Sequence, residues 1–217
     1  MILYNTLTRN KEELKQKKIN MYVCGVTVYD RPHLGHALST VTFDVLHRYL
    51  EYKGFKVKRV QNFTDVDDKI INKSKELKIS AEEVAEKYIK SFFEDMDALG
   101  VRRADVHPRA TEDMKEIIEF IGNLIQKKAA YVSNGSVYFD VSYSSDYGKL
   151  SRRNLEDEIG GTRIEKDMDK HNSADFALWK KAPENETHWD SPWGIGRPGW
   201  HMECSAMVRK HLGETID

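Results

Sequence analysis

The fold is decided by residues 19–63, which read INMYVCGVTVYDRPHLGHALSTVTFDVLHRYLEYKGFKVKRVQNF. The apolar run Ile19–Val26 predicts a strand, and the alternating residues 55–63 predict a second one. Between them, Leu34, Leu38, Val41, Val45 and Tyr49 recur at helical spacing, and Gly54 stands where a left-handed cap would end a helix. Strand, helix and strand in this order predict a βαβ unit, whose parallel strands bind ligands at their carboxyl ends.

The loop from Thr27 to His33 lies at that ligand-binding edge and leads into Pro32-His33-Leu34-Gly35-His36. Two imidazoles three residues apart at the first turn of a helix face a region where free backbone N–H groups favour an anion. Gly35 leaves room for a nucleotide to approach the backbone. These features favour a phosphate site, although histidines that only cap or cover the helix start are the alternative.

Other polar or sulfur-bearing residues stand at the same predicted edge. Cys24 ends the first strand, and Asn62-Phe63-Thr64-Asp65 ends the second, where the polar side chains could hold a small ligand or start a turn. Cys204 and Trp200 belong to a later helical pattern. Each cysteine by itself is most simply a buried side chain, and Trp200 is either a core residue or a pocket floor. The spacing of the two cysteines does not by itself indicate a metal site.

The rest of the chain separates into a helical part and a turn-rich part. Helices are expected over residues 67–77, 81–98 and 112–127, with Ser80 and Glu83 as a capping box and Thr111 as an N-cap. Asn134-Gly135 between two short apolar runs predicts a hairpin, and prolines and glycines crowd residues 183–199. We therefore expect residues 1–127 to be the first half of a parallel-sheet domain, 128–197 a small antiparallel insertion, and 198–217 a return to the first domain.

Composition narrows the class of protein. The 217 residues are 40% hydrophobic and 32% charged, which is typical of a globular chain, and the net charge of −1 argues against coating nucleic acid through overall charge. The cluster Lys56, Lys58 and Arg59 is expected to be a solvated face or an edge strand. No apolar run is long enough to cross a bilayer and no leader is recognised after Met1, so we expect a cytoplasmic protein without a membrane partner.

Four separate blocks closely resemble the family of cysteinyl-tRNA synthetases, and they occur in that family's order. They are residues 22–30, 32–36, 62–69 and 199–207. The resemblance implies a Rossmann-type α/β catalytic domain of a class I ligase, interrupted by a connective insertion. It also implies ATP-dependent activation of cysteine to an adenylate and transfer to tRNA(Cys), with a monomer as the expected state.

The same resemblance assigns roles to individual residues. His33 and His36 would be catalytic, stabilising charge on ATP held with Mg²⁺, and Leu34 replaces the usual isoleucine of that signature. Thr27, Gly35 and Ser39 would contribute to ATP binding. Cys24 and Cys204 match two of four zinc ligands, and zinc would select the thiolate of cysteine over serine. The residues that would contact the substrate are Cys24, Asn62, Thr64 and Trp200.

The resemblance also marks what residues 1–217 lack. Two further zinc ligands and a lysine-rich ATP signature would begin beyond Asp217, so we expect these residues alone to bind zinc weakly and to be inactive. One alternative is the cysteine ligase of mycothiol synthesis, which is similar throughout this region and uses an amino sugar as acceptor. Another is a non-catalytic fragment or binding module.

Overall fold

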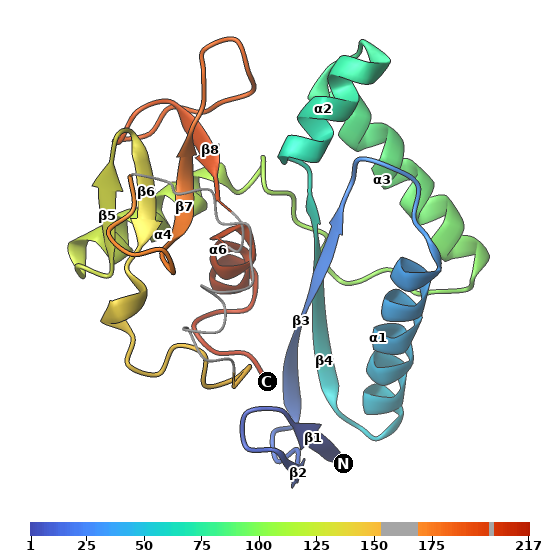
Figure 1. The fold of residues 1–217 in the computed structure, drawn as a ribbon. Coiled ribbons are helices and arrows are strands. Elements are labelled where there is room, and N and C mark those ends of the chain that lie inside the picture. Colours follow the sequence, from blue (N-terminus) through green and yellow to red (C-terminus); the bar gives the residue numbers. More distant parts are fainter. Residues whose placement is uncertain (153–168, 200–201) are drawn as a thin grey trace. The chain divides into compact units, whose positions relative to one another are not determined.

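The computed structural model describes residues 1–152, 169–199 and 202–217, and the chain divides into two compact units (Figure 1). Residues 16–117 and 203–217 form the first, which we call the parallel unit. Residues 1–15 and 118–202 form the second, the antiparallel unit. None of the helices within the described residues is both long enough and apolar enough to cross a membrane. The sequence-based boundaries at 127 and 197 stay a prediction.

The parallel unit is built on the expected βαβ arrangement. Strand β3 (Lys18–Thr27), helix α1 (Leu34–Tyr52) and strand β4 (Lys56–Thr64) follow one another, and β3 pairs with β4 in parallel. Gly54 has φ +84° directly after the helix, so the predicted left-handed cap is confirmed. Isolated parallel bridges join β4 to Val106 and Arg109. The α/β class expected from the sequence is therefore confirmed.

Helices complete the parallel unit and supply much of its core. Helices α2 (Asp68–Leu77) and α3 (Ala81–Ala98) pack with β4 through a buried cluster that includes Phe63, Ile70 and Phe92. The predicted capping box of Ser80 and Glu83 is present at the start of α3. Apolar burial of this kind stabilises by about 1.5–3 kcal/mol for each large side chain. The cluster thus fixes the strand that carries Asn62 and Thr64.

Helix α1 does not bury the apolar stripe by which it was recognised. Leu34 and Leu38 are 88% and 71% exposed, and Val45 and Tyr49 are also exposed. The buried positions are instead Thr40, Asp44, His47 and Leu50. The helix was predicted correctly, but three of its four buried residues are polar. Thr40 and His47 contact residues of the same helix, whereas Asp44 also contacts a residue from another segment of the chain.

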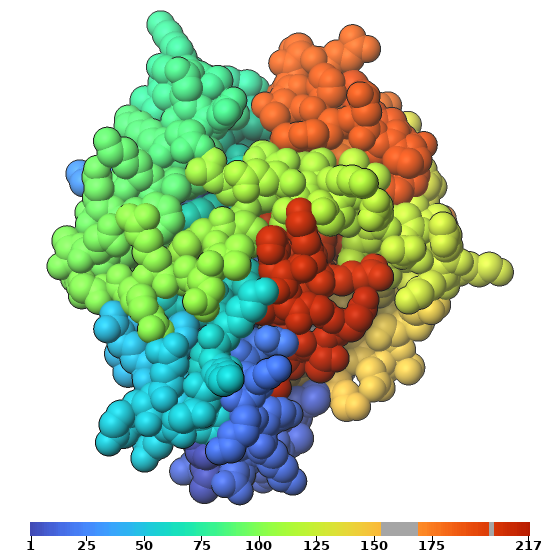
Figure 2. Space-filling view, turned by 180° about the vertical axis from the view of Figure 1, so that it is seen from behind, coloured from blue at the N-terminus to red at the C-terminus, as the bar shows by residue number. Residues whose placement is uncertain are grey.

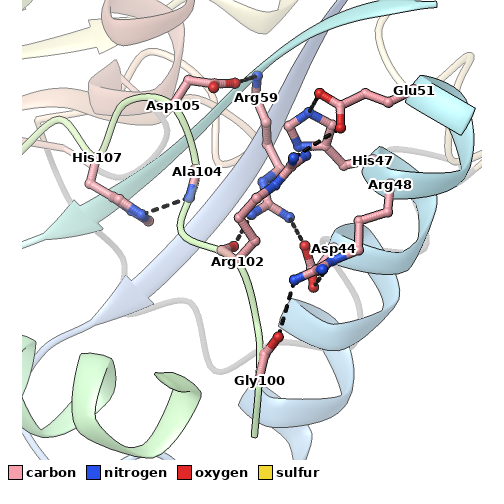
Figure 3. Close-up of polar contacts among 10 residues, drawn as sticks. All are labelled: Asp44, His47, Arg48, Glu51, Arg59, Gly100, Arg102, Ala104, Asp105 and His107. Atoms are coloured by element: carbon pink, nitrogen blue, oxygen red, sulfur yellow. Dashed lines mark hydrogen bonds and ion pairs between the residues drawn. The ribbon is translucent and has the colours of Figure 1, made fainter. Parts of the chain in front are cut away.

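The main partner is Arg59, which is 0% exposed rather than part of a solvated face (Figure 3). Its guanidinium lies 3.7 Å from the Asp44 carboxylate and donates a hydrogen bond to the carbonyl of Arg102. The backbone N–H of Arg59 donates to Asp105 at 2.7 Å. The solvated face expected for this residue was wrong, although it does lie in a strand. A buried arginine needs paired charges, and a sequence does not show which acids lie beside it.

The fourth helix, α4 (Met114–Gln126), begins two residues later than expected. The hydroxyl of Thr111 donates to Asp65 at 2.5 Å instead of capping the helix, and the Asp113 carbonyl accepts the first helical bond. The carboxylate of Asp113 binds Lys210 and His211 of helix α6 (Met202–His211). In Figure 2 the red C-terminal segment accordingly borders the light-green chain around the start of α4.

The described residues of the antiparallel unit form two small sheets. Strands β1 (Ile2–Asn5) and β2 (Asn10–Glu13) form one hairpin. The other sheet has the order β5-β6-β7-β8, and its elements are β5 (Ala130–Ser133), β6 (Ser136–Phe139), the 3₁₀ turn η1 (Val141–Tyr143), β7 (Phe176–Lys181) and β8 (Gly196–Pro198). Asn134 and Gly135 have φ of 50° and 83°, as the predicted two-residue hairpin requires.

Candidate active site at the carboxyl ends of β3 and β4

A bulge in β3 shapes the first part of the site. Val23 pairs with Gln61 and Val26 with Phe63, so Cys24 and Gly25 together lie opposite the single residue Asn62. Such a bulge redirects a side chain that a regular strand would place differently. A Cβ on Gly25 would lie 1.6 Å from the carbonyl oxygen of Asn62, so only glycine fits here. The bulge leaves Cys24 exposed.

The two cysteines meet at this bulge. Their sulfur atoms lie 3.6 Å apart, one in the bulge of β3 and the other in the first turn of α6. Hydrogen bonding from the Cys204 thiol lowers the pKa of Cys24 to about 7, whereas that interaction and burial raise the pKa of Cys204. The pair therefore loses its first proton easily and its second with difficulty.

The N-terminal end of α1 forms the second part of the site. His33 is the N-cap, and its Nδ1 accepts a hydrogen bond from the N–H of Gly35 at 3.0 Å. The Nδ1 of His36 accepts from the N–H of His33 at 3.3 Å, and the two rings stack with centroids 3.8 Å apart. Since Nδ1 is the acceptor in both neutral rings, the proton of each lies on Nε2. Both imidazoles are thus prepared to donate through Nε2.

The structure gives a reason for the glycine at position 35, Gly35, that the sequence did not reveal. A Cβ at this position would lie 2.9 Å from Cε1 of His33, so the glycine makes room for the capping ring itself. Burial, followed by the charge of His33, lowers the pKa of His36. His36 therefore tends to stay neutral in the absence of an anion.

The remaining predicted residues are placed as follows. Thr27 and Thr64 pair with each other at the ends of β3 and β4, and Thr64 is buried. Ser39 is exposed on α1. Asn62 is fully buried, and its side-chain oxygen accepts hydrogen bonds from within the protein. Trp200 lies outside the described residues. The roles assigned to all of these residues stay predictions.

Two residues that sequence reasoning did not select belong to this site. Tyr22 contributes its hydroxyl, and burial, followed by the Cys204 thiol, raises its pKa, so the hydroxyl stays protonated. Glu203 is 3% exposed, and burial raises its pKa to about 8, with smaller contributions from Cys204 and Asp67. Tyr22 lies two residues before Cys24, whereas nothing in the sequence indicated that Glu203 is buried.

The described residues supply part of a metal site. Among residues 1–152, 169–199 and 202–217, no group of three His, Cys, Asp or Glu side chains is placed to hold a metal ion. Cys24 and Cys204 thus form a pair of sulfur donors without a third donor from this part of the chain.

A parallel sheet with a histidine-capped helix at its carboxyl edge is the arrangement expected of a nucleotide-binding domain. Residues 10–217 match the model of one family, described as tRNA synthetases class I (C) catalytic domain, and the chain belongs to this family. It is 57% identical to a cysteine–tRNA ligase of Clostridioides difficile (strain 630), over 100% of this chain and 47% of that protein.

Other relatives carry the same name. The chain is 55% identical to a cysteine–tRNA ligase of Thermococcus gammatolerans, over 99% of this chain and 46% of the relative. It thus spans about half the length of the curated relatives that it matches. Among solved structures it is similar to LeuRS of Agrobacterium radiobacter K84 in a ternary complex with tRNA and LeuAMS, at 16% identity and a TM-score of 0.48, over 60% of this chain and 18% of that one.

Proposed function

We propose that the protein containing this chain is a cysteine–tRNA ligase, which uses ATP to form cysteinyl adenylate and transfers cysteine to tRNA(Cys). The observation that carries the proposal is the sulfur pair, together with the histidine-capped helix of the same unit. Family membership and the names of the relatives support it. We extend the proposal to a monomeric protein of the cytoplasm.

His33 and His36 would act on the phosphates of ATP. Each ring donates through Nε2, and the dipole of α1 adds further positive potential at the N-terminal end of the helix. Negative charge that develops as the carboxylate of cysteine attacks the α-phosphorus would be stabilised by these fixed donors. The Mg²⁺ that accompanies ATP, and the contacts of Thr27, Gly35 and Ser39 with the nucleotide, belong to the same proposal.

Cys24 and Cys204 would hold zinc. Two sulfurs bound to one tetrahedral zinc at about 2.3 Å lie about 3.8 Å apart, and the observed separation of 3.6 Å fits this requirement. The metal would supply a soft Lewis acid for the thiolate of the substrate, which serine cannot match. The easily lost proton of Cys24 suits a ligand that must be deprotonated. Asn62, Thr64 and Trp200 would surround the bound amino acid.

The experiment compares acceptors. The full-length protein is mixed with ATP, cysteine and either tRNA(Cys) or the glucosaminyl-inositol acceptor of mycothiol synthesis. We expect charged tRNA and no sugar adduct. Transfer to the sugar alone would overturn the proposal, and so would the absence of cysteine-dependent pyrophosphate exchange.

A further inference from the structure

The spacing of the two sulfurs depends on more than the cysteines. Cys24 lies in an irregular part of β3, and Cys204 lies on a helix 180 residues away in the sequence. Neither a bulge nor a separate helix defines a position as strictly as a regular sheet pairing does. Other contacts must therefore hold both sulfurs.

Asn62 is the residue that contacts the bulge. It is 0% exposed, and its Oδ1 accepts the N–H of Gly25 at 2.8 Å. This bond joins the side chain of β4 to the backbone directly after Cys24. The backbone of Gly25 also lies so close to the carbonyl of Asn62 that no side chain fits between them, so the bulge packs directly against this residue.

The same oxygen is connected to α6. Oδ1 of Asn62 also accepts the hydroxyl of Tyr22 at 3.0 Å, and that hydroxyl lies 3.7 Å from Sδ of Met207. Met207 lies on α6, the helix that carries Cys204. One amide oxygen is thereby linked to Cys24 through Gly25 and to the helix of Cys204 through Tyr22 and Met207.

We propose that Asn62 is a positioning residue that fixes the distance between the Cys24 and Cys204 sulfurs. It acts on the Cys24 sulfur through Gly25, and on the Cys204 sulfur through Tyr22 and Met207 of the same helix. A buried amide oxygen that accepts from two donors is costly to leave unmatched, so the arrangement resists distortion. The inference bears on the metal-binding part of the proposed function, but it concerns the protein before any metal binds.

The test uses the full-length, metal-free, reduced protein. Diamide takes two electrons and two protons from the two thiols, and the rate of the Cys24–Cys204 disulfide is followed by peptide mass spectrometry. We expect Asn62→Ala to slow this reaction at least 10-fold and Tyr22→Phe to slow it several-fold. The double variant should form the disulfide at a rate within twofold of that of Asn62→Ala, because both changes remove the same linkage.

Thr40→Val is the matched control, since Thr40 is a buried residue whose hydroxyl donates to the His36 carbonyl, outside the Asn62 linkage. It should leave the disulfide rate within twofold of the unaltered protein even where its thermal stability falls. Equal slowing in this control, or an unchanged rate in a folded Asn62→Ala protein, would overturn the inference. Where Asn62→Ala does not fold, an unchanged rate in Tyr22→Phe overturns it.

Cobalt binding gives a second readout that is independent of activity. The intensity of the sulfur-to-cobalt charge-transfer band should fall in Asn62→Ala and stay in Thr40→Val. If the unaltered protein does not bind cobalt, the metal proposal is refuted. The disulfide rates would still decide the role of Asn62.

Discussion

The sulfur of Cys24 lies 3.6 Å from the sulfur of Cys204, with the first in the bulge of a strand and the second on a helix. Because the proposed zinc site would take both sulfurs as ligands, we expect Cys24→Ser and Cys204→Ser each to lower zinc affinity of the full-length protein by at least about 100-fold. Zinc content by mass spectrometry and cysteine-dependent pyrophosphate exchange check this. Retained zinc in either variant would contradict the assignment.

Capping and catalysis can be separated at His33. Asparagine is a strong N-cap but lacks the outward Nε2–H, so His33→Asn should keep thermal stability while lowering pyrophosphate exchange by about 100- to 1,000-fold. His33→Ala should lower both, with a stability loss of about 1 kcal/mol. Equal activity of His33→Asn and the unaltered protein would show that the ring only caps the helix.

The buried face of α1 makes a prediction about stability. Asp44→Ala leaves the guanidinium of Arg59 without its nearest acid and should cost about 3–5 kcal/mol. Glu51→Ala is the control on the same helix, because Glu51 is half-exposed and its pair with Arg102 should contribute less than about 1 kcal/mol. Urea unfolding measures both, and equal losses would contradict the proposed importance of the buried pair.

Acid should weaken the parallel unit through His107. Its Nε2 accepts the N–H of Ala104, and burial lowers its pKa to about 4, with smaller contributions from Arg59 and Arg103. The unfolded chain therefore binds a proton that the folded chain does not, so stability is complete above pH 6.5 and falls as the pH drops toward 4. The loss reaches about 3 kcal/mol, and urea unfolding at several pH values should show a smaller slope in His107→Gln.

Much of the fold followed from local patterns. The β3–α1–β4 unit, the capping box at Ser80 and the hairpin at Asn134 were recognised because each depends on neighbours in the sequence. The burial of Arg59 and the exposure of Leu34 were not recognised, because both depend on partners from distant segments. The usual rule assumes that a helix buries its apolar face, and here a charged pair takes that place.

The candidate site divides in the same way. His33, Gly35 and His36 were singled out because they lie within four residues, and their hydrogen bonds could be anticipated from the start of a helix. The pairing of Cys24 with Cys204 came only from the family resemblance, since it needs a bulge and a remote helix. Tyr22 and Asn62 connect these elements through buried hydrogen bonds, which no spacing in the sequence reveals.

The uncovered stripe of α1 has a practical effect on samples of residues 1–217. Leu34, Leu38, Val45 and Tyr52 face water along one side of a 19-residue helix. A contiguous exposed apolar surface of this kind promotes association between molecules. Light scattering by concentrated solutions of this polypeptide should therefore rise steeply, and replacing Leu38 and Val45 by glutamate should keep the particles small and dispersed.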